Sequence, residues 1–206
     1  MGAADAAWAL SAGGFALAMS ATPGPNNAML AASGATFGMP RSLPHILGVS
    51  VGFPVMFAAV ALGAGEAFQA NPVLSRALHW IGAAYLLWLA WHVATARPGT
   101  RADGAARARP LRFVEAAAFQ WVNPKAWLVA VSGIAAYATE GGQVAPAKVL
   151  ILATLFLLVC VPVTMLWTGL GAGASQVLRT GRRMRAFNAA MAAVLVASLV
   201  PMLFGR

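Results

Sequence analysis

Six long apolar stretches follow one another along the chain, and short polar segments separate them. The stretches are residues 6–37, 42–68, 73–96, 113–139, 147–171 and 186–204. A helix needs about 20 apolar residues to cross the ~30 Å hydrocarbon layer of a membrane. The pattern therefore predicts an all-α integral membrane protein with about six transmembrane helices, which form a single domain over residues 1–206.

The composition supports a membrane protein. Hydrophobic residues make up 60% of the 206 residues and charged residues only 9%, which is too little charge to cover a water-soluble globule. We therefore expect lipid to cover most of the surface. The net charge of +9 would suit a nucleic-acid binder, but the basic residues cluster between apolar stretches. We expect no nucleic-acid partner.

The basic residues predict an orientation in the membrane. Ten arginines lie in the loops after the first, third and fifth stretches: Arg41, Arg97, Arg101, Arg107, Arg109, Arg112, Arg179, Arg182, Arg183 and Arg185. The other loops and the tail hold only Arg76, Lys148 and Arg206. By the positive-inside rule, both termini lie outside the cytoplasm and residues 97–112 form a cytoplasmic linker. If the first stretch does not cross, five spans remain and the amino terminus reverses.

The first apolar stretch contains a predicted break. It runs from residue 6 to residue 37, and a straight helix of that length would measure about 48 Å, well beyond the membrane's apolar thickness. Prolines remove backbone donors, glycine permits unusual dihedral angles, and asparagine can cap a new helix. All three occur in the middle of this stretch, as Pro23, Gly24, Pro25, Asn26 and Asn27.

A second break is predicted in the fourth stretch, at Asn123, Pro124 and Lys125. Asparagine is a favoured N-cap, and proline is favoured at the first helical position. Non-helical backbone at membrane depth is tolerated only where protein buries it or where it lines a wet cavity. We therefore expect both breaks to face the interior of the protein.

The two breaks suggest an internal repeat. Ala-Met-Leu follows the first break and Ala-Trp-Leu the second, each with Ser-Gly a few residues later. Two three-helix half-repeats, residues 1–96 and 113–206, would then have opposite polarity in the membrane, as in many secondary transporters. Such similarity also arises by chance in an alanine-rich sequence, so both explanations stay open.

Broken helices in corresponding positions point to a transporter's binding site, because the amino ends of half-helices carry partial positive charge. Lys125 adds a full positive charge there, although a lysine at this depth can also snorkel to the interface. A substrate carboxylate is therefore expected between the breaks. The predicted substrate-binding residues are Pro23, Gly24, Pro25, Asn26, Asn27, Gln120, Asn123, Pro124 and Lys125.

Glu115 is the candidate for carrying a coupling proton, although its spacing from Arg112 also suits a surface ion pair. We expect no catalytic residues, since no reacting pair converges in one cavity. No metal site is expected either, because Cys160 is the only cysteine and the three histidines are scattered. Gly48 and Gly52 allow close helix contact, within the chain or in a homo-oligomer.

Four motifs together resemble the LysE/RhtB family of amino-acid exporters. They are Pro23-Gly24-Pro25-Asn26-Asn27, the glycines Gly48 and Gly52 in the second span, residues 80–86 in the third, and Asn123-Pro124-Lys125 in the fourth. The paired asparagines and residues 85–91 look most like its cysteine and O-acetylserine branch.

This resemblance implies a secondary carrier in the bacterial inner membrane that exports amino acids or close derivatives and uses protons as the coupling ion. It implies membrane lipid as a partner, no cofactor and no covalent chemistry. A passive channel or a membrane assembly protein is the alternative function.

Overall fold

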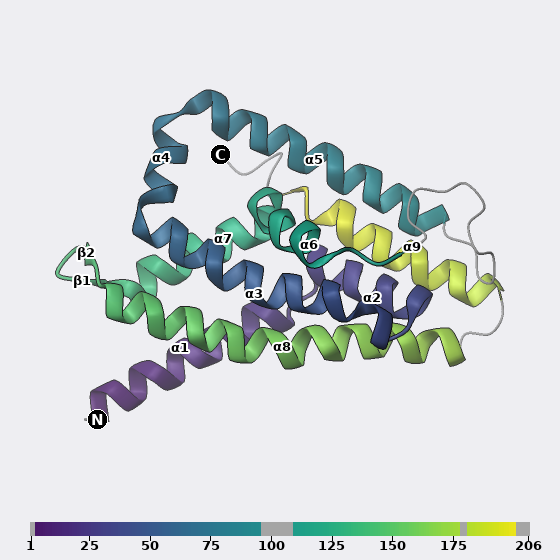
Figure 1. Cartoon of the computed structure of the whole chain (residues 1–206), viewed down its shortest axis with the longest axis horizontal. Coiled ribbons are helices and arrows are strands. Elements are labelled where there is room, and N and C mark those ends of the chain that lie inside the picture. Colours follow the sequence, from purple (N-terminus) through teal and green to yellow (C-terminus); the bar gives the residue numbers. More distant parts are fainter. Residues whose placement is uncertain (1–2, 96–108, 178–180, 201–206) are drawn as a thin grey trace.

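The computed structural model describes residues 3–95, 109–177 and 181–200, and helices make up most of them (Figure 1). The first half contains α1 (Ala3–Ala21), α2 (Pro25–Phe37), the 3-10 turn η1 (Pro40–Ser42), α3 (Leu43–Ala59), the π-helical turn η2 (Val60–Ala64), α4 (Gly65–Ala70) and α5 (Pro72–Thr95). The second half contains α6 (Phe113–Phe119), the 3-10 turn η3 (Gln120–Val122), α7 (Pro124–Gly133), the π-helical turn η4 (Ile134–Ala138), β1 (Thr139–Glu140), β2 (Gln143–Val144), α8 (Pro146–Val177) and α9 (Gly181–Ala197).

Three continuous helices in the described part of the chain are long and apolar enough to cross a membrane. They are Pro40–Ala64, Arg76–Thr95 and Pro146–Ser175. The first and fourth predicted spans are each divided into shorter helices, α1 with α2 and α6 with α7. The prediction of an all-α membrane protein is confirmed.

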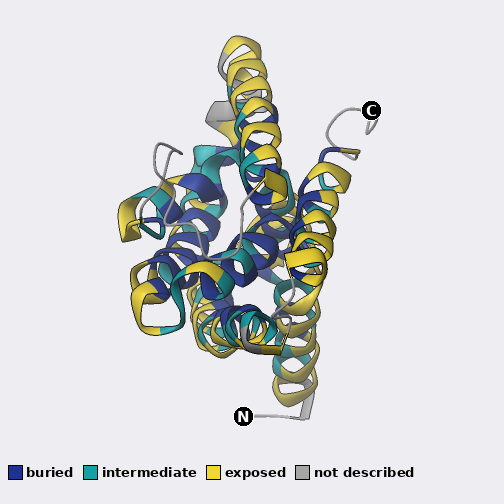
Figure 2. Ribbon diagram, turned by 90° about the vertical axis from the view of Figure 1, so that its right-hand side faces the viewer, coloured by how far each residue is buried: buried dark blue, intermediate teal, exposed yellow. Residues whose placement is uncertain are grey.

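Helix α8 lies at the centre of the packing, with α1, α2 and α3 against it. Helix α6 packs on α3, and α5 packs on α9. Buried residues face the middle of this bundle, whereas the outward faces are exposed (Figure 2). Many exposed residues are large and apolar, such as Leu10, which is 80% exposed, and Trp91, which is 69% exposed. An apolar outer surface of this kind suits lipid rather than water.

Glycines bring two pairs of helices into close contact. A Cβ atom on Gly34 of α2 would collide with the Thr168 carbonyl of α8, and one on Gly171 of α8 would collide with the Ala31 carbonyl of α2. Gly48 and Gly52 of α3 press in the same way against α6. The close contact predicted at this second pair therefore lies within the chain.

A short β-hairpin between η4 and α8 was not predicted. Thr139 pairs with Val144 and Glu140 pairs with Gln143. The turn consists of Gly141 and Gly142, with φ angles of 58° and 81°. Tight hairpin turns with positive φ at both central residues favour glycine. The predicted fourth stretch therefore ends in an ordered turn.

The described basic residues gather toward one end of the bundle. The segment around η1, the residues before α6 and the start of α9 lie toward the right-hand end of Figure 1, whereas the amino terminus and the hairpin lie at the left. Six of the ten loop arginines belong to that right-hand end: Arg41, Arg109, Arg112, Arg182, Arg183 and Arg185. Most of the predicted linker 97–112 lies outside the described residues, as does Arg179.

Candidate functional site

The first predicted break is present. Helix α1 ends at Ala21 and α2 begins at Pro25, which occupies the first turn. The prediction that an asparagine caps the new helix was wrong, because the N-cap is Gly24, with an extended backbone and no side-chain cap. Asn27 instead caps the helix before the break. Its Nδ2 atom donates to the carbonyl oxygens of Ser20 (2.8 Å) and Thr22 (2.9 Å), at the carboxyl end of α1, where helical carbonyls lack partners.

The second break is present at Asn123, between the short turn η3 and α7. Asn123 has extended backbone angles and is the N-cap of α7, with Pro124 in the first turn. Its Oδ1 atom accepts a hydrogen bond of 3.1 Å from the backbone N–H of Lys125. This is the cap that the residue types predicted.

Side chains join the two breaks across the interior. Asn26 and Gln120 form a reciprocal amide pair, with Nδ2 to Oε1 at 2.9 Å and Nε2 to Oδ1 at 3.1 Å. The Lys125 ammonium donates to the Thr22 carbonyl. Lys125 therefore binds the end of the opposite half-helix.

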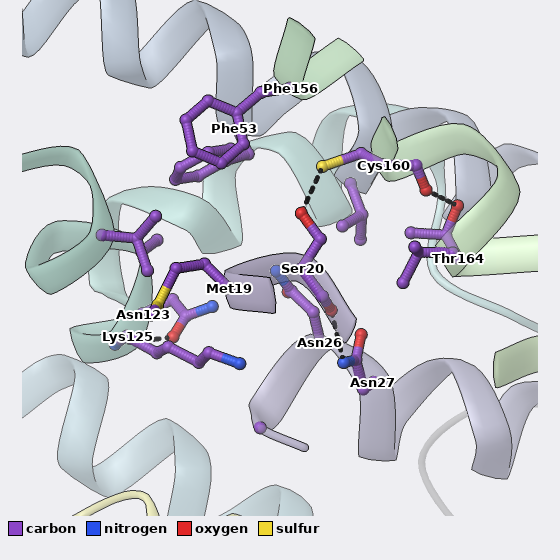
Figure 3. Close-up of a pocket in the computed structure, with 15 residues that line it drawn as sticks. Met19, Ser20, Asn26, Asn27, Phe53, Asn123, Lys125, Phe156, Cys160 and Thr164 are labelled. Atoms are coloured by element: carbon purple, nitrogen blue, oxygen red, sulfur yellow. Dashed lines mark hydrogen bonds between the residues drawn. The ribbon is translucent and has the colours of Figure 1, made fainter. Parts of the chain in front are cut away.

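A cavity of about 50 Å³ lies between the breaks (Figure 3). At ~10–15 Å³ per water by this measure, it has room for roughly three to five waters. Helices α1, α2, α3, α7 and α8 contribute its walls. Its lining residues are Met19, Ser20, Gly24, Asn26, Asn27, Val49, Phe53, Asn123, Lys125, Ala126, Val129, Phe156, Cys160, Val163 and Thr164.

The cavity has a polar side and an apolar side. The labelled polar side chains of both breaks point toward one another around the lower part of the cavity in Figure 3. Phe53 and Phe156 form the aromatic part of the other side, with ring centroids 4.9 Å apart in an edge-to-face arrangement. Between the two, the Ser20 hydroxyl lies 3.5 Å from the Cys160 sulfur. This arrangement suits a small solute with a charged end and a short, weakly polar side chain.

The predicted site residues divide into three groups. Gly24, Asn26, Asn27, Asn123 and Lys125 line the cavity. The prolines at 23, 25 and 124 shape the breaks without lining it. Gln120 does not line the cavity, because this fully buried side chain pairs with the Asn26 amide and also donates to the Ala116 carbonyl at 2.9 Å.

Glu115 does not line the cavity. Its carboxylate forms two bonds with the Arg109 guanidinium, of 2.7 and 2.9 Å, and accepts a third from the backbone N–H of Arg112. The predicted ion pair with the Arg112 side chain is therefore replaced by one with Arg109. The Glu115 carboxylate raises the pKa of Arg109 above its ordinary value.

Residues from two unbroken helices complete the cavity and were not predicted. Phe53 belongs to α3, and Phe156, Cys160 and Thr164 belong to α8. In the sequence they resemble ordinary members of apolar spans. No local pattern distinguishes them, since it is the crossing of α3 and α8 that brings them to the breaks.

The sequence pattern of the LysE type translocators matches residues 17–200. The chain is 33% identical over 123 residues to a cysteine/O-acetylserine efflux protein of Klebsiella pneumoniae. It is 35% identical over 126 residues to proteins of the same name from Salmonella typhimurium and Escherichia coli K12.

Each of these matches covers 60% of this chain and 61–62% of the relative, so the chain spans about three fifths of the length of the curated relatives it matches. No solved structure matches. The family match extends over both breaks and every residue that lines the cavity. The chain belongs to the LysE family of translocators.

Proposed function

We propose that this protein is a secondary active exporter of small amino acids or their close derivatives across the bacterial inner membrane. The observation that carries the proposal is the cavity between two half-helix amino ends, which is lined by Asn26, Asn123 and Lys125. Relatives named cysteine/O-acetylserine efflux proteins support the same substrate class. Cysteine and O-acetylserine are accordingly the first candidates.

The substrate carboxylate lies near the amino ends of α2 and α7 in this proposal. Both ends carry partial positive charge, and Lys125 adds a full one. The substrate side chain then points past the Ser20–Cys160 pair, which lies between the two sides, toward Phe53 on the opposite side. A cavity of about 50 Å³ favours a short side chain over those of lysine or leucine.

Transport proceeds by alternating access around this cavity, with protons as the coupling ion. The contacts support a two-fold internal repeat, because α1 packs on α8 while its counterpart α6 packs on α3. Glu115 remains the candidate for carrying the coupling proton, although its carboxylate lies outside the cavity. The arginine-rich end of the bundle faces the cytoplasm, and both termini lie outside.

The test is uptake of labelled amino acids into inverted membrane vesicles. Cysteine, O-acetylserine, homoserine, threonine, leucine and lysine are compared, with and without an uncoupler. We expect uphill uptake of cysteine or O-acetylserine that the uncoupler abolishes. Uptake that only follows the gradient and ignores the uncoupler would identify a channel, and no uptake of any of the six would refute the proposed substrate class.

A further inference from the structure

The carboxyl end of α1 already holds an ammonium group. The Thr22 carbonyl oxygen accepts a hydrogen bond from the Nζ atom of Lys125, a residue 103 positions away. Asn27 binds the same carbonyl at 2.9 Å and the Ser20 carbonyl at 2.8 Å. Of these two carbonyls, the one of Thr22 binds the Lys125 cation at the edge of the cavity, and both accept from Asn27.

Helix electrostatics explain why the lysine reaches this point. Lys125 stands in the first turn of α7, where the helix dipole disfavours a cation, whereas the carboxyl end of α1 attracts one. Its side chain crosses Gly24 on the way. A Cβ atom at residue 24 would lie 2.7 Å from the Lys125 Cδ atom and 3.3 Å from Nζ. Gly24 has an extended backbone with φ of −176°, which any residue can adopt. Glycine therefore matters here because a larger residue would block the path of the Lys125 side chain.

We propose that these α1 carbonyls form the subsite for the substrate's α-ammonium group, and that Lys125 fills this subsite while the carrier is empty. An arriving amino acid replaces one ammonium group with another of the same charge. The Lys125 ammonium then turns to the substrate carboxylate, so that both charges of the zwitterion and the charge of the lysine are paired. This inference rests on the proposed function and deepens it.

The exchange selects for molecules that carry both charged groups. An amine without a carboxylate would displace Lys125 and leave its charge unpaired in a half-buried site, which is unfavourable. An acid without an amine would draw Lys125 away and leave the carbonyls without their cation. Amino acids avoid both losses, so the cavity discriminates against simple amines and simple acids of equal size.

Chemical rescue tests the subsite directly, on the purified full chain. Lys125→Ala removes the resident ammonium, and ethylammonium is then added during thermal unfolding, with propan-1-ol as the neutral comparison. We expect ethylammonium, and not propan-1-ol, to raise the Tm of Lys125→Ala by about 2–4 °C, because a ligand that binds only the folded state stabilises it. The wild-type protein and the Lys148→Ala control, which loses the partly buried partner of the exposed Glu140, should not respond. An equal response in all three proteins, or none in Lys125→Ala, would overturn the subsite.

A second variant covers the case in which Lys125→Ala does not fold. Lys125→Met keeps most of the length of the side chain without its charge. Cysteamine, which lacks the carboxylate, should bind Lys125→Met about tenfold more tightly than it binds the wild-type protein, a gain of about 1.4 kcal/mol. 3-Mercaptopropionate, which lacks the amine, should bind Lys125→Met more weakly than it binds the wild-type protein. Cysteamine affinity that stays equal or falls would contradict the exchange.

The two proposals fail separately. If wild-type vesicles export no amino acid while ethylammonium still rescues Lys125→Ala, the ammonium subsite stands and the exporter assignment falls. If vesicles export cysteine while neither rescue nor the cysteamine gain occurs, the exporter stands and the substrate's ammonium binds elsewhere.

Discussion

Lys125 connects the two breaks at the scale of single residues, since it begins one half-helix and binds the end of the other. Lys125→Met should reduce efflux at least about tenfold, because losing about 1.4 kcal/mol of substrate binding lowers affinity tenfold. Efflux is measured at equal membrane abundance, with Lys148→Met as the matched loss of a lysine that lies outside the cavity. Wild-type efflux by Lys125→Met would remove this residue from the site.

Gly24 offers a second test, which leaves every charge in place. Gly24→Ala should displace the Lys125 side chain from its path and lower efflux, while the Tm changes little because a flexible side chain can move aside. Gly13→Ala is the control, since a Cβ atom there meets nothing within 4 Å. Equal efflux by both variants would show that the path across Gly24 is unimportant.

At the scale of elements, the prolines of the first break hold α1 and α2 apart. Proline lacks the N–H that would continue a helix, so replacing both Pro23 and Pro25 with alanine should favour a continuous helix. We expect the double variant to insert into the membrane and lose efflux. Pro44→Ala, in the first turn of α3 and outside the cavity, serves as the control. Unchanged efflux by the double variant would count against a functional break.

The α2–α8 interface tests packing rather than chemistry. A methyl group on Gly171 would meet the Ala31 backbone, which cannot move aside as a side chain can. Gly171→Ala should therefore lower stability by about 1–3 kcal/mol. Gly173→Ala on the same helix should not, because its added methyl group meets nothing within 4 Å. The measurement is the Tm of each purified variant in thermal unfolding. Equal Tm values would contradict the close packing.

For the whole molecule, the separation of basic residues predicts orientation. In a Cys160→Ser background, Glu140→Cys on the hairpin should react with an impermeant maleimide on intact cells. Arg183→Cys at the start of α9 should react only after the membrane is opened, because the positive-inside rule places that end in the cytoplasm. The opposite labelling pattern would reverse the proposed orientation.

The sequence alone determined the membrane fold and the positions of both breaks. Span length and composition require apolar helices, and local steric rules place a break wherever Pro, Gly and Asn interrupt one. The Asn123 cap was predicted correctly because capping depends on adjacent residues. The Gly24 cap was not, because the first break contains several residues able to cap, and the Asn27 side chain bonds the end of α1 instead of the start of α2.

Only the tertiary structure decided what the breaks contact. The bond between Lys125 and Thr22, the pairing of Asn26 with Gln120, and the wall formed by Phe53, Phe156 and Cys160 all join distant segments. Helix-terminal rules act over a few residues, whereas the crossing of α2, α3, α6 and α8 depends on glycine contacts between helices far apart in the chain. A sequence pattern therefore marks where a helix breaks, and the packing decides which groups face one another across the break.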